Sequence, residues 1–532
     1  MSRRTIPLRQ AAGGFAPQTF RCKPRMVRSR RGMVLVLVLV VVALLTLACF
    51  TFSKLMLVER RASQLSSQRA QARCLAESGM EMAKLFVLYD KTSQDEAGGW
   101  YDNEARFRGM SVVDDGSGQD VGRFSIVAPR LVDGIAEGVR FGLEDESTRL
   151  NLNALLLADQ ATENGGRDLL MALPGMTEEV ADAILDWIDE DDEIREFGAE
   201  VDYYSALQPP YEPKNGPLES VEELLLVRDI TPWLLFGADS NRNGYLDANE
   251  TGAENVDGVD NTDGSMNRGW SAYLTLYSAE VNLNPDGEEK IDLNQDDMQE
   301  LYDQLEAAIG AEFATFIVAY RQGEDANTGG GQTVSGTIDL DLTQGAEREV
   351  SQLLELVGKN VTVTTQGGDE VDLESPFPDM PGMMGYLTTL MDHVAVVASP
   401  VIRGRININQ APRAVLSGIP GITEEAVDRI ISERELDPAL REDYQRHETW
   451  ILADGIVTLD EMKTLMPFVT GGGSVYRAQI IGYFDRGGPA VRIETIFDAT
   501  VSPARLLFYR DLTHLGRGYP LETLGVEAVD AF

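Results

Sequence analysis

The chain has 532 residues and a formal net charge of −40, from 46 Lys and Arg against 86 Asp and Glu. With 43% hydrophobic residues and 22 prolines, the composition supports packed cores and excludes a disordered chain. Nine of the cations and no acid lie in residues 1–32, so the other 500 residues carry a formal charge of −49. A body this negative repels phosphate, which argues against ordinary nucleic-acid binding.

Cysteine and histidine are too scarce to form a disulfide or zinc framework in the body of the chain. Cys22 lies in the basic leader and Cys49 in an apolar run, which leaves Cys74 alone. The three histidines are scattered, so no ligand set of Cys and His is available. The sequence has no nucleophile and base motif, no HExxH and no nucleotide-binding loop, so we expect no enzyme.

The apolar run Met33–Phe52 contains twenty residues and no charge. As a helix it is about 30 Å long, the thickness of a bilayer core, so we expect a transmembrane segment. All the cations of the leader precede it, and the positive-inside rule then places the N-terminus in the cytoplasm and residues 54–532 outside. A cleaved secretory signal is the alternative, but no small-x-small cleavage site follows the run.

Helical periodicity continues beyond the apolar run. From Leu55 to Phe86, apolar residues recur three to seven positions apart, with no proline between them. The pattern predicts one nearly continuous helix from Met33 to about Asp90.

The boundary between the basic leader and the apolar run resembles the leader of type IV prepilins and pseudopilins. In SRRGMVLVLVLVVVALL, Gly32 follows basic residues and precedes the apolar run. The resemblance implies cleavage after Gly32 by prepilin peptidase, with a methylated Met33 as the first mature residue. Most pilins have a glutamate at the fifth mature position, whereas this chain has Leu37. Within the family, the subunit that lacks this glutamate is the large minor pseudopilin K of type II secretion.

Alternating apolar and polar residues predict strands in two separate places. Strand patterns start at Val121 and Glu137, and similar patterns return at Ser474, Ala490 and Ala504. The long stretch between them has mainly helical periodicity. We therefore expect an α+β fold: an N-terminal transmembrane helix continues into a pseudopilin-like antiparallel sheet that carries a large α-helical insertion of helix-hairpin-helix or SAM-like type. Two consecutive domains are the alternative.

These patterns divide the chain into six segments. They are a basic prepilin-type leader at 1–32, a transmembrane segment at 33–52, an extended amphipathic helix at 53–92, the first part of the pseudopilin sheet at 105–145, an α-rich insert at 146–470 and the C-terminal strands of the sheet at 474–532. We expect the insert to contain both the helical repeats and a calcium loop.

The insert contains three copies of a repeat. Each copy is a basic residue followed by alternating apolar and Asn or Asp residues, and a helical hairpin pattern comes next: Arg149–Leu156, Lys290–Asp297 and Arg405–Pro412. The first and third hairpins resemble helix-hairpin-helix units, which often hold DNA phosphate at a helix start. Here Thr177 and Thr423 replace the second glycine of the usual G-x-G turn, and two glutamates follow each. Because threonine can cap the helix and the glutamates repel phosphate, we expect packing modules.

The segment DSNRNGYLDANE matches the twelve positions of an EF-hand calcium loop. Its ligand positions are occupied by Asp239, Asn241, Asn243, Tyr245 through its carbonyl, Asp247 and Glu250. Gly244 occupies the sixth position, where the loop turns sharply. Hard oxygen ligands at these offsets predict bound Ca²⁺, and an acidic surface turn is the alternative. The flanks do not show clearly paired helices, which indicates a stabilising loop rather than an opening sensor.

Two further acidic groups have spacings that leave metal binding open. One is a candidate second partial site: Asp257, Asp260 and Asp263. The other lies in DWIDEDDEIREFGAEVDYY, with these acids among its members: Asp186, Asp189, Asp191, Glu200 and Asp202. Together with NGPLESVEELLLV, this stretch closely resembles the central signature of the minor pseudopilin K family. The resemblance implies a head in which an inserted α-domain carries bound calcium.

The resemblance implies a structural protein of a secretion machine. We expect a minor pseudopilin at the tip of a type II secretion pseudopilus, which initiates the filament and contacts cargo. Its expected partners are other minor pseudopilins, the inner-membrane assembly platform and prepilin peptidase, with no nucleic acid, and its expected place is the inner membrane with a periplasmic body. A membrane-anchored helix-hairpin-helix DNA receptor of competence type and a minor pilin of a related type IV pilus are the alternatives.

Overall fold

The computed structural model describes residues 31–113, 120–244, 250, 267–326, 333–379, 382–397 and 399–526. The chain divides into two compact units, Met1–Ser66 and Ser67–Phe532, and each is described by itself.

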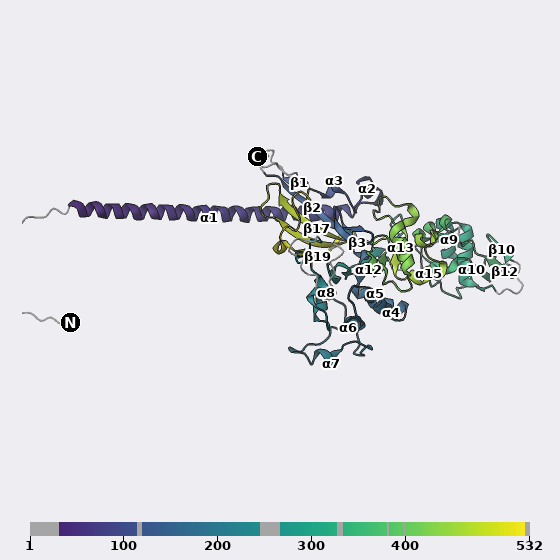
Figure 1. Ribbon diagram of the computed structural model, residues 1–532. Coiled ribbons are helices and arrows are strands. Elements are labelled where there is room, and N and C mark those ends of the chain that lie inside the picture. The colour runs from purple at the N-terminus through teal and green to yellow at the C-terminus, as the bar shows by residue number, and fades with distance from the viewer. Residues whose placement is uncertain are drawn as a thin grey trace, which may run out of the picture. The chain divides into compact units, whose positions relative to one another are not determined.

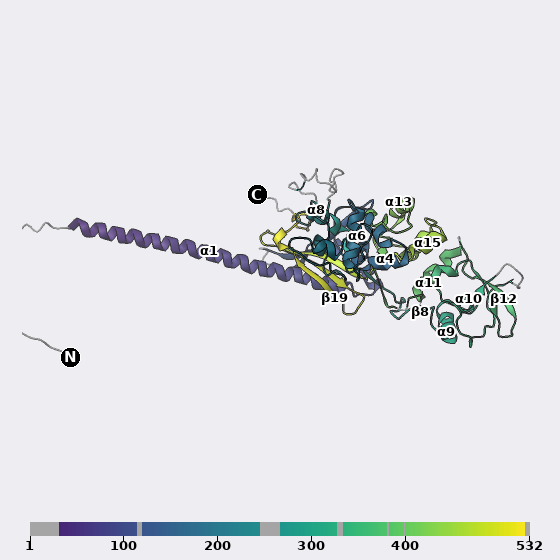
Figure 2. The same ribbon diagram turned by 90° about the horizontal axis from the view of Figure 1, so that it is seen from below.

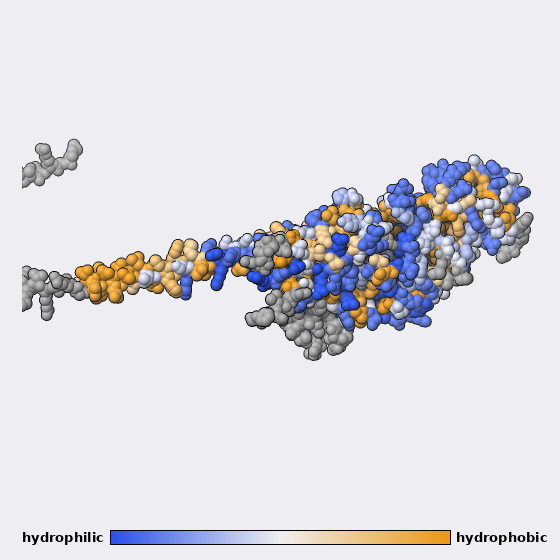
Figure 3. Space-filling model, turned by 90° about the horizontal axis from the view of Figure 1, so that it is seen from above, coloured by the Kyte–Doolittle hydropathy of each residue, from blue (hydrophilic) through white to orange (hydrophobic). Residues whose placement is uncertain are grey.

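The described part of the first unit is the start of helix α1 (Arg31–Phe86). Met33 opens the one helix among the described residues that is long and apolar enough to cross a membrane. Its apolar side chains are exposed to the surroundings, Leu37 to 66%, and the visible face of this segment is apolar throughout in Figure 3. This segment fits a single-pass membrane anchor.

Helix α1 ends slightly earlier than its periodicity predicted. The sequence indicated a helix to about Asp90, whereas α1 ends at Phe86. Asp90 instead begins the next helix, α2 (Lys91–Glu96), because its carboxylate accepts a hydrogen bond from the backbone nitrogen of Ser93 at 2.9 Å. An N-cap residue has non-helical backbone angles, so the chain must leave α1 before it reaches Asp90.

The second unit contains a seven-stranded antiparallel sheet, built from two distant parts of the chain (Figure 1). Its main path runs β1-β2-β17-β18-β19, with β3 paired to β2 and β4 paired to β17. The strands are β1 (Met110–Val113), β2 (Gly122–Val132), β3 (Ile135–Arg140), β4 (Glu144–Asp145), β17 (Val475–Phe484), β18 (Val491–Asp498) and β19 (Arg505–Asp511). This confirms the expected combination of an N-terminal apolar helix with an antiparallel sheet.

The C-terminal part of α1 packs directly on the middle of this sheet. A Cβ atom on Gly482 of β17 would overlap the backbone oxygen of Ala72, and one on Gly79 would lie 2.8 Å from Ile480 and Phe124. Glycine at both positions therefore lets helix and strand backbones approach closely. Ala72 and Phe124 belong to the buried cluster that joins the helix to the sheet.

Each of the three repeats forms a unit that closes on itself. The first strand of each unit pairs in parallel with its last strand: β5 (Leu150–Asn151) with β6 (Leu274–Thr275), β8 (Ile291–Asp292) with β13 (Val394–Ala395), and β15 (Ile406–Asn407) with β16 (Val469–Thr470). We call these the first, second and third repeat units. Their paired helices are α5 (Gly165–Met171) and α6 (Glu178–Ile188), α9 (Met298–Ile309) and α10 (Ala311–Gln322), and α12 (Arg413–Leu416) and α13 (Glu424–Glu433).

One asparagine after each first strand holds its unit together. Asn153 donates to the carbonyl of Leu218 at 3.0 Å and accepts from its backbone nitrogen at 2.8 Å. Asn294 makes the same two bonds with Val350, at 3.0 and 2.8 Å. In the third unit, Asn409 donates to two backbone carbonyls. The alternating apolar and asparagine pattern of the repeat thus specifies a strand followed by an asparagine whose amide binds backbone groups of its own unit.

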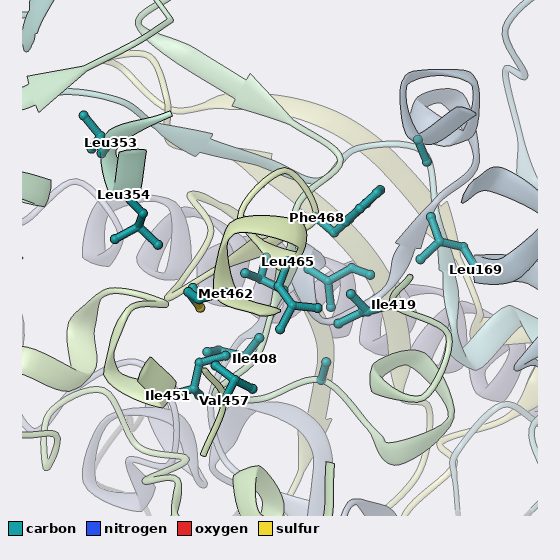
Figure 4. Close-up of a cluster of buried hydrophobic side chains, with 14 of the residues drawn as sticks. Leu169, Leu353, Leu354, Ile408, Ile419, Ile451, Val457, Met462, Leu465 and Phe468 are labelled. Atoms are coloured by element: carbon teal, nitrogen blue, oxygen red, sulfur yellow. The ribbon is translucent and has the colours of Figure 1, made fainter. Parts of the chain in front are cut away.

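The three units share a hydrophobic core that is separate from the core of the sheet. Figure 4 shows part of it, where residues of different units meet: Leu169 from the first unit, Leu353 and Leu354 from the second, and Ile408, Ile419, Ile451, Val457, Met462, Leu465 and Phe468 from the third. Because these side chains pack together, the units form one body rather than independent beads.

The second repeat unit also contains a small sheet that the sequence analysis missed. Its order is β10-β12-β11-β9, and it lies beside α10 (Figure 2). The strands are β9 (Glu324–Asp325), β10 (Thr333–Val334), β11 (Asn360–Thr364) and β12 (Glu370–Glu374). The signal was present as alternating Val and Thr before a Gly-Gly turn, but the helical patterns around it dominated the prediction.

Shorter helices complete the second unit, and all of them except α3 lie in the insert. The remaining helices are α3 (Glu104–Phe107), α4 (Leu155–Ala161), α7 (Val201–Tyr204), α8 (Pro232–Phe236), α11 (Leu387–His393), α14 (Trp450–Ala453) and α15 (Leu459–Leu465). The two linkers that flank the second unit pair with each other. β7 (Ala279–Val281), before the unit, is antiparallel to β14 (Val401–Arg403), after it. This pairing braces the second unit at its entry and its exit.

Candidate metal sites

The predicted calcium loop begins directly after α8. The carboxylate of Asp239 accepts from the backbone nitrogens of Asn243 at 3.0 Å and Gly244 at 2.9 Å, and Asn241 also accepts from the nitrogen of Asn243 at 3.0 Å. Gly244 has a φ of +73°, the left-handed conformation that glycine adopts easily. These bonds wind the first half of the loop around the carboxylate of Asp239.

The two ends of the loop bring buried carboxylates together. Asp239 is 5% exposed and Glu250 is 4% exposed. Glu250 accepts from the backbone nitrogen and the hydroxyl of Ser240, at 3.0 and 2.8 Å, so the first and last ligand positions lie side by side. Burial raises the pKa of Asp239, and the charge of Glu250 adds to this rise. A bound cation would stabilise both ionised groups.

The described members of the predicted ligand set fit calcium in type. Asp239, Asn241, Asn243 and Glu250 offer oxygen ligands within one loop, and the other two predicted ligands, Tyr245 and Asp247, lie outside the described residues. The candidate partial site of Asp257, Asp260 and Asp263 also lies outside them. Across the described ranges, no three side chains of Asp, Glu, His or Cys form a metal-binding group. Among the described residues of the loop, the predicted ligands are thus two carboxylates and two amides.

The calcium loop is attached to the sheet rather than to its own helical unit alone. Arg492 of β18 donates to the carbonyl of Asn241, and Gln479 of β17 donates to the carbonyl of Arg242 at 3.2 Å. Asn243 donates to the carbonyl of Gly518 at 2.8 Å. The loop thus bridges the first repeat unit, two central strands and the C-terminal segment.

The acidic signature forms a second cluster, at the end of α6. Asp186 is fully buried and Glu200 is 4% exposed. Arg195 lies 3.2 Å from Asp159, 3.4 Å from Asp186 and 3.8 Å from Asp189. Both carboxylate oxygens of Glu200 are buried without a hydrogen-bond partner. One arginine is therefore surrounded by more negative charge than it can compensate.

Crowding of like charges changes the acidity of this cluster. Burial and the neighbouring carboxylates raise the pKa of Asp189 and of Glu200 to about 7, and burial raises the pKa of Asp186 to about 6. A Cβ atom on Gly198 would overlap the carboxylate of Asp186, so the glycine of the GAE signature makes room for that side chain. At neutral pH the cluster favours a proton or a cation.

The other two acids of the signature are not part of the buried cluster. Asp191 accepts from the backbone nitrogen of Glu193 at 2.8 Å in an exposed turn, and Asp202 is exposed on α7. Asp191 still contributes to the raised pKa of Asp189 through its charge. Sequence spacing did not separate these roles, because the chain turns back between Asp191 and Glu200.

The processing residues lie at the start of α1. Gly32 and Met33 occupy its first turn, and Met33 is 60% exposed. Leu37, at the position where most pilins have glutamate, lies one turn further along the same helix. Cleavage and methylation at this position stay predictions.

The predicted helix caps are confirmed in both hairpins. Thr177 accepts from the backbone nitrogen of Val180 at 3.4 Å, and Thr423 accepts from that of Ala426 at 3.2 Å. Two glutamates occupy the first turn of each following helix. The N–H groups that could hold a phosphate are therefore capped within the chain.

Sequence reasoning missed two arginines at these sites. Arg195 is the one cation within DDEIREFGAE, so its place among acids gave a usable signal. Arg492 gave none, because it lies in a strand pattern far from the calcium loop in sequence. Its contact with the loop depends on how the first repeat unit is placed against the sheet.

The segment that holds the acidic cluster also carries the similarity to known proteins. Residues 148–235 match the family model described as type II secretion system (T2SS), protein K. No curated protein has a matching sequence. A chain in the crystal structure of the GspK-GspI-GspJ complex from enterotoxigenic Escherichia coli type 2 secretion system is similar, with 12% identity, coverage of 85% of this chain and 99% of that chain, and a TM-score of 0.36. Residues 148–235 are therefore similar to the type II secretion system protein K family, the minor pseudopilins that the sequence resembles.

Proposed function

We propose that this chain is a minor pseudopilin at the tip of a type II secretion pseudopilus, where it initiates the filament and contacts secreted cargo. The match of residues 148–235 supports the assignment to type II secretion. The observation that supports the tip position is the apolar segment of α1, in which Leu37 replaces an acid. A carboxylate in hydrocarbon needs a partner, and a terminal subunit has no neighbour above it to supply one.

A single substitution tests the tip position. Leu37→Glu places an unpaired carboxylate in the lipid-exposed part of α1, so we expect loss of filament initiation and of secretion. Leu37→Met, which keeps the position apolar, is the matched control and should behave as the natural chain. Normal secretion by Leu37→Glu, with equal amounts of protein in the membrane, would contradict the proposal.

We further propose an inner-membrane anchor with a cytoplasmic N-terminus and a periplasmic body, processed by prepilin peptidase and assembled with other minor pseudopilins and the inner-membrane platform. Mass spectrometry should show that the mature chain begins at methylated Met33, and an intact Gly32–Met33 bond would contradict processing.

Cys74 is exposed on α1 beyond the apolar segment. A membrane-impermeant maleimide added to whole cells with a permeabilised outer membrane should therefore label Cys74, and Cys74→Ser should abolish the signal.

The same proposal assigns calcium to the loop from Asp239 to Glu250. Two buried carboxylates of like charge and two amide side chains support this assignment, because hard oxygen ligands are those that calcium prefers. When bound, the ion would supply positive charge to the loop, and the loop's own contacts with Arg492 and Gly518 would carry the stabilisation to the sheet. Calcium would then brace a body that has no disulfide.

The acidic cluster at the end of α6 is proposed as a second cation site. Its support is the carboxylate of Glu200, which is buried with both oxygens unpartnered, and the raised pKa of Asp189.

Both sites are tested by thermal melting of the mature chain in detergent, with calcium or chelator. The pair Asp239→Asn and Glu250→Gln should remove one part of the calcium response, and Glu200→Gln another. Glu306→Gln, at an exposed acid, is the control.

We propose finally that the hairpins α5–α6 and α12–α13 are helix-hairpin-helix modules used for packing. Their capped helix starts and first-turn glutamates support this role. A mobility shift with duplex DNA at low salt should show no binding, and a shift would favour the DNA-receptor alternative.

A further inference from the structure

A cavity of about 370 Å³ lies between the sheet and the insert. Its walls come from the β2–β3 hairpin, the turn at Trp270 and the start of α12, and Figure 1 shows β3 beside α12. The hairpin and α12 are in direct contact, because the nitrogen of Arg413 donates to the carbonyl of Gly134 at 3.1 Å. Neither of the candidate metal sites lines this cavity. A volume of this size is in the range of ligand-binding pockets.

One wall of the cavity contains a buried arginine without an acid. Arg140 is 4% exposed and forms no ion pair with any residue of the described ranges. Its Nη1 donates to the carbonyl of Tyr101, its guanidinium stacks on the Tyr101 ring at 3.7 Å, and its Nε has no hydrogen-bond partner. Burial lowers the pKa of Arg140. A buried charge that lacks a partner is strongly unfavourable, so this group is prepared for an anion.

The side chains that line the cavity are mainly positive, although Glu144, Asp102 and Asp437 also act on Arg140 through their charges. Arg268 and Arg413 line the same cavity, and Glu144 is its one lining carboxylate. Glu144 is already paired with Arg149 at 2.5 Å. Arg413 pairs with Asp428 at 2.6 Å on the surface side, where its side chain is 40% exposed. The chain as a whole has a net charge of −40 and repels anions, but the positive lining of this cavity attracts an anion locally.

The rest of the lining is apolar. It includes Leu131, Ile135, Pro174, Trp270 and Pro412. Ile135 is 44% exposed at the hairpin and so gives the cavity an apolar mouth. A small inorganic anion would leave these walls unused. An anionic group on an apolar body uses both the guanidinium and the walls.

We infer that this cavity binds the C-terminal carboxylate and the last apolar side chains of a partner polypeptide. Arg140 lines the cavity, and a guanidinium offers the fork geometry that suits a carboxylate. The apolar walls then accommodate the terminal side chains. Leucine or phenylalanine at the end of the partner fits this lining.

The inference is tested with a pair of dipeptides on the full mature chain in detergent. Acetyl-Leu-Phe with a free carboxylate should bind in calorimetric titration, and its C-terminal amide should bind at least about tenfold more weakly, because a charge-assisted hydrogen bond is lost. Inorganic phosphate is the third probe. Equal binding of acid and amide, binding of phosphate as tight as that of the acid, or no binding of the acid at 10 mM would each overturn the inference.

Variants locate the binding. Arg140→Gln should abolish the preference for the acid over the amide. Because Arg140 is buried and its loss can impair folding, two surface variants provide independent tests: Arg413→Gln and Ile135→Glu should each weaken binding of the acid several-fold without changing the melting temperature by more than a few degrees. Arg505→Gln, at a side chain that is 62% exposed outside the cavity, is the matched control. Unchanged affinity in both Arg413→Gln and Ile135→Glu would overturn the inference.

Discussion

The first and third repeat units have the same scaffold but treat buried acids in opposite ways. Both are closed by a parallel strand pair and both have threonine-capped hairpins. In the third unit, Arg405 pairs with Glu448 and, at 2.8 Å, with Glu280 of the linker strand β7, so both buried acids share one cationic partner, although burial still raises the pKa of Glu280 to about 7. In the first unit, Glu200 has no hydrogen-bond partner and its neighbours are acids. One scaffold thus supports a group of buried acids that shares an arginine and a group in which a buried acid has no hydrogen-bond partner.

The largest expected effect comes from removing Arg405, the cation that the buried acids of the third unit share. Arg405→Met leaves Glu280 and Glu448 buried without a cation, and we expect the free energy of unfolding to fall by about 3–5 kcal/mol. Denaturant unfolding measures the change. Calcium should not rescue this variant, since the third unit is proposed to need none. Arg505→Met removes a pair in which the arginine is 62% exposed and should cost only about 1 kcal/mol; a similar cost for Arg405→Met would refute the contrast.

Removal of calcium tests the first repeat unit, which contains the loop from Asp239 to Glu250. At a calcium concentration of about one hundred times the dissociation constant, binding stabilises the folded chain by about 2.7 kcal/mol per site, so a chelator should lower the melting temperature by several degrees. The variant with Asp239→Asn and Glu250→Gln should lose the part of this shift that belongs to the loop. A full response in that variant would assign all of the calcium effect to other residues.

The pH dependence sharpens the comparison further. Asp186, Asp189 and Glu200 have pKa values of about 6, 7 and 7 in the folded chain, above those of an unfolded chain. The folded state therefore holds protons more tightly, and in chelator its stability should fall as pH rises from about 4 to 7, by about 1–3 kcal/mol. Melting curves measure the fall.

Two controls interpret that pH profile. Glu200→Gln should flatten the profile in chelator, and saturating calcium should flatten it in the natural chain. A profile that falls equally with and without calcium would show that the ion does not bind at this cluster.

The smallest effect is predicted to be equal in the two units. Thr177→Ala and Thr423→Ala each remove a helix cap, and each should cost about 1 kcal/mol. Denaturant midpoints measure both. A clearly larger cost in one unit would show that the hairpins do not share one scaffold role.

The sequence predicted those features that depend on neighbours along the chain. The apolar helix, five of the seven strands of the sheet, the repeat, the threonine caps and the turn at Gly244 all follow local patterns, whereas β1 and β4 were not predicted. The closing strands were not predictable, since two-residue strands such as β5 and β6 are too short to show periodicity and lie far apart in sequence.

The site features that escaped prediction depend on packing between distant segments. Arg492 contacts the calcium loop only because β18 lies under it. Arg140 is buried on β3, where its Nε has no hydrogen-bond partner and its guanidinium stacks on Tyr101, a residue about forty positions earlier in the chain. In both cases the residue sits in an ordinary alternating strand, and its chemistry arises from what the fold places opposite it.

The insert departs from the sheet and returns to it at one place. β4 ends at Asp145, and the α-carbon of Asp145 pairs with that of Tyr476 in β17, so the outgoing and incoming ends are adjacent. Gly473 and Asn407 both donate to Asp145, which locks this neck. Additional modules grafted beyond the neck, or deletion of existing ones, would change the reach of the head while leaving the strand ladder beneath it intact. The insert can therefore diversify in sequence and length independently of the sheet.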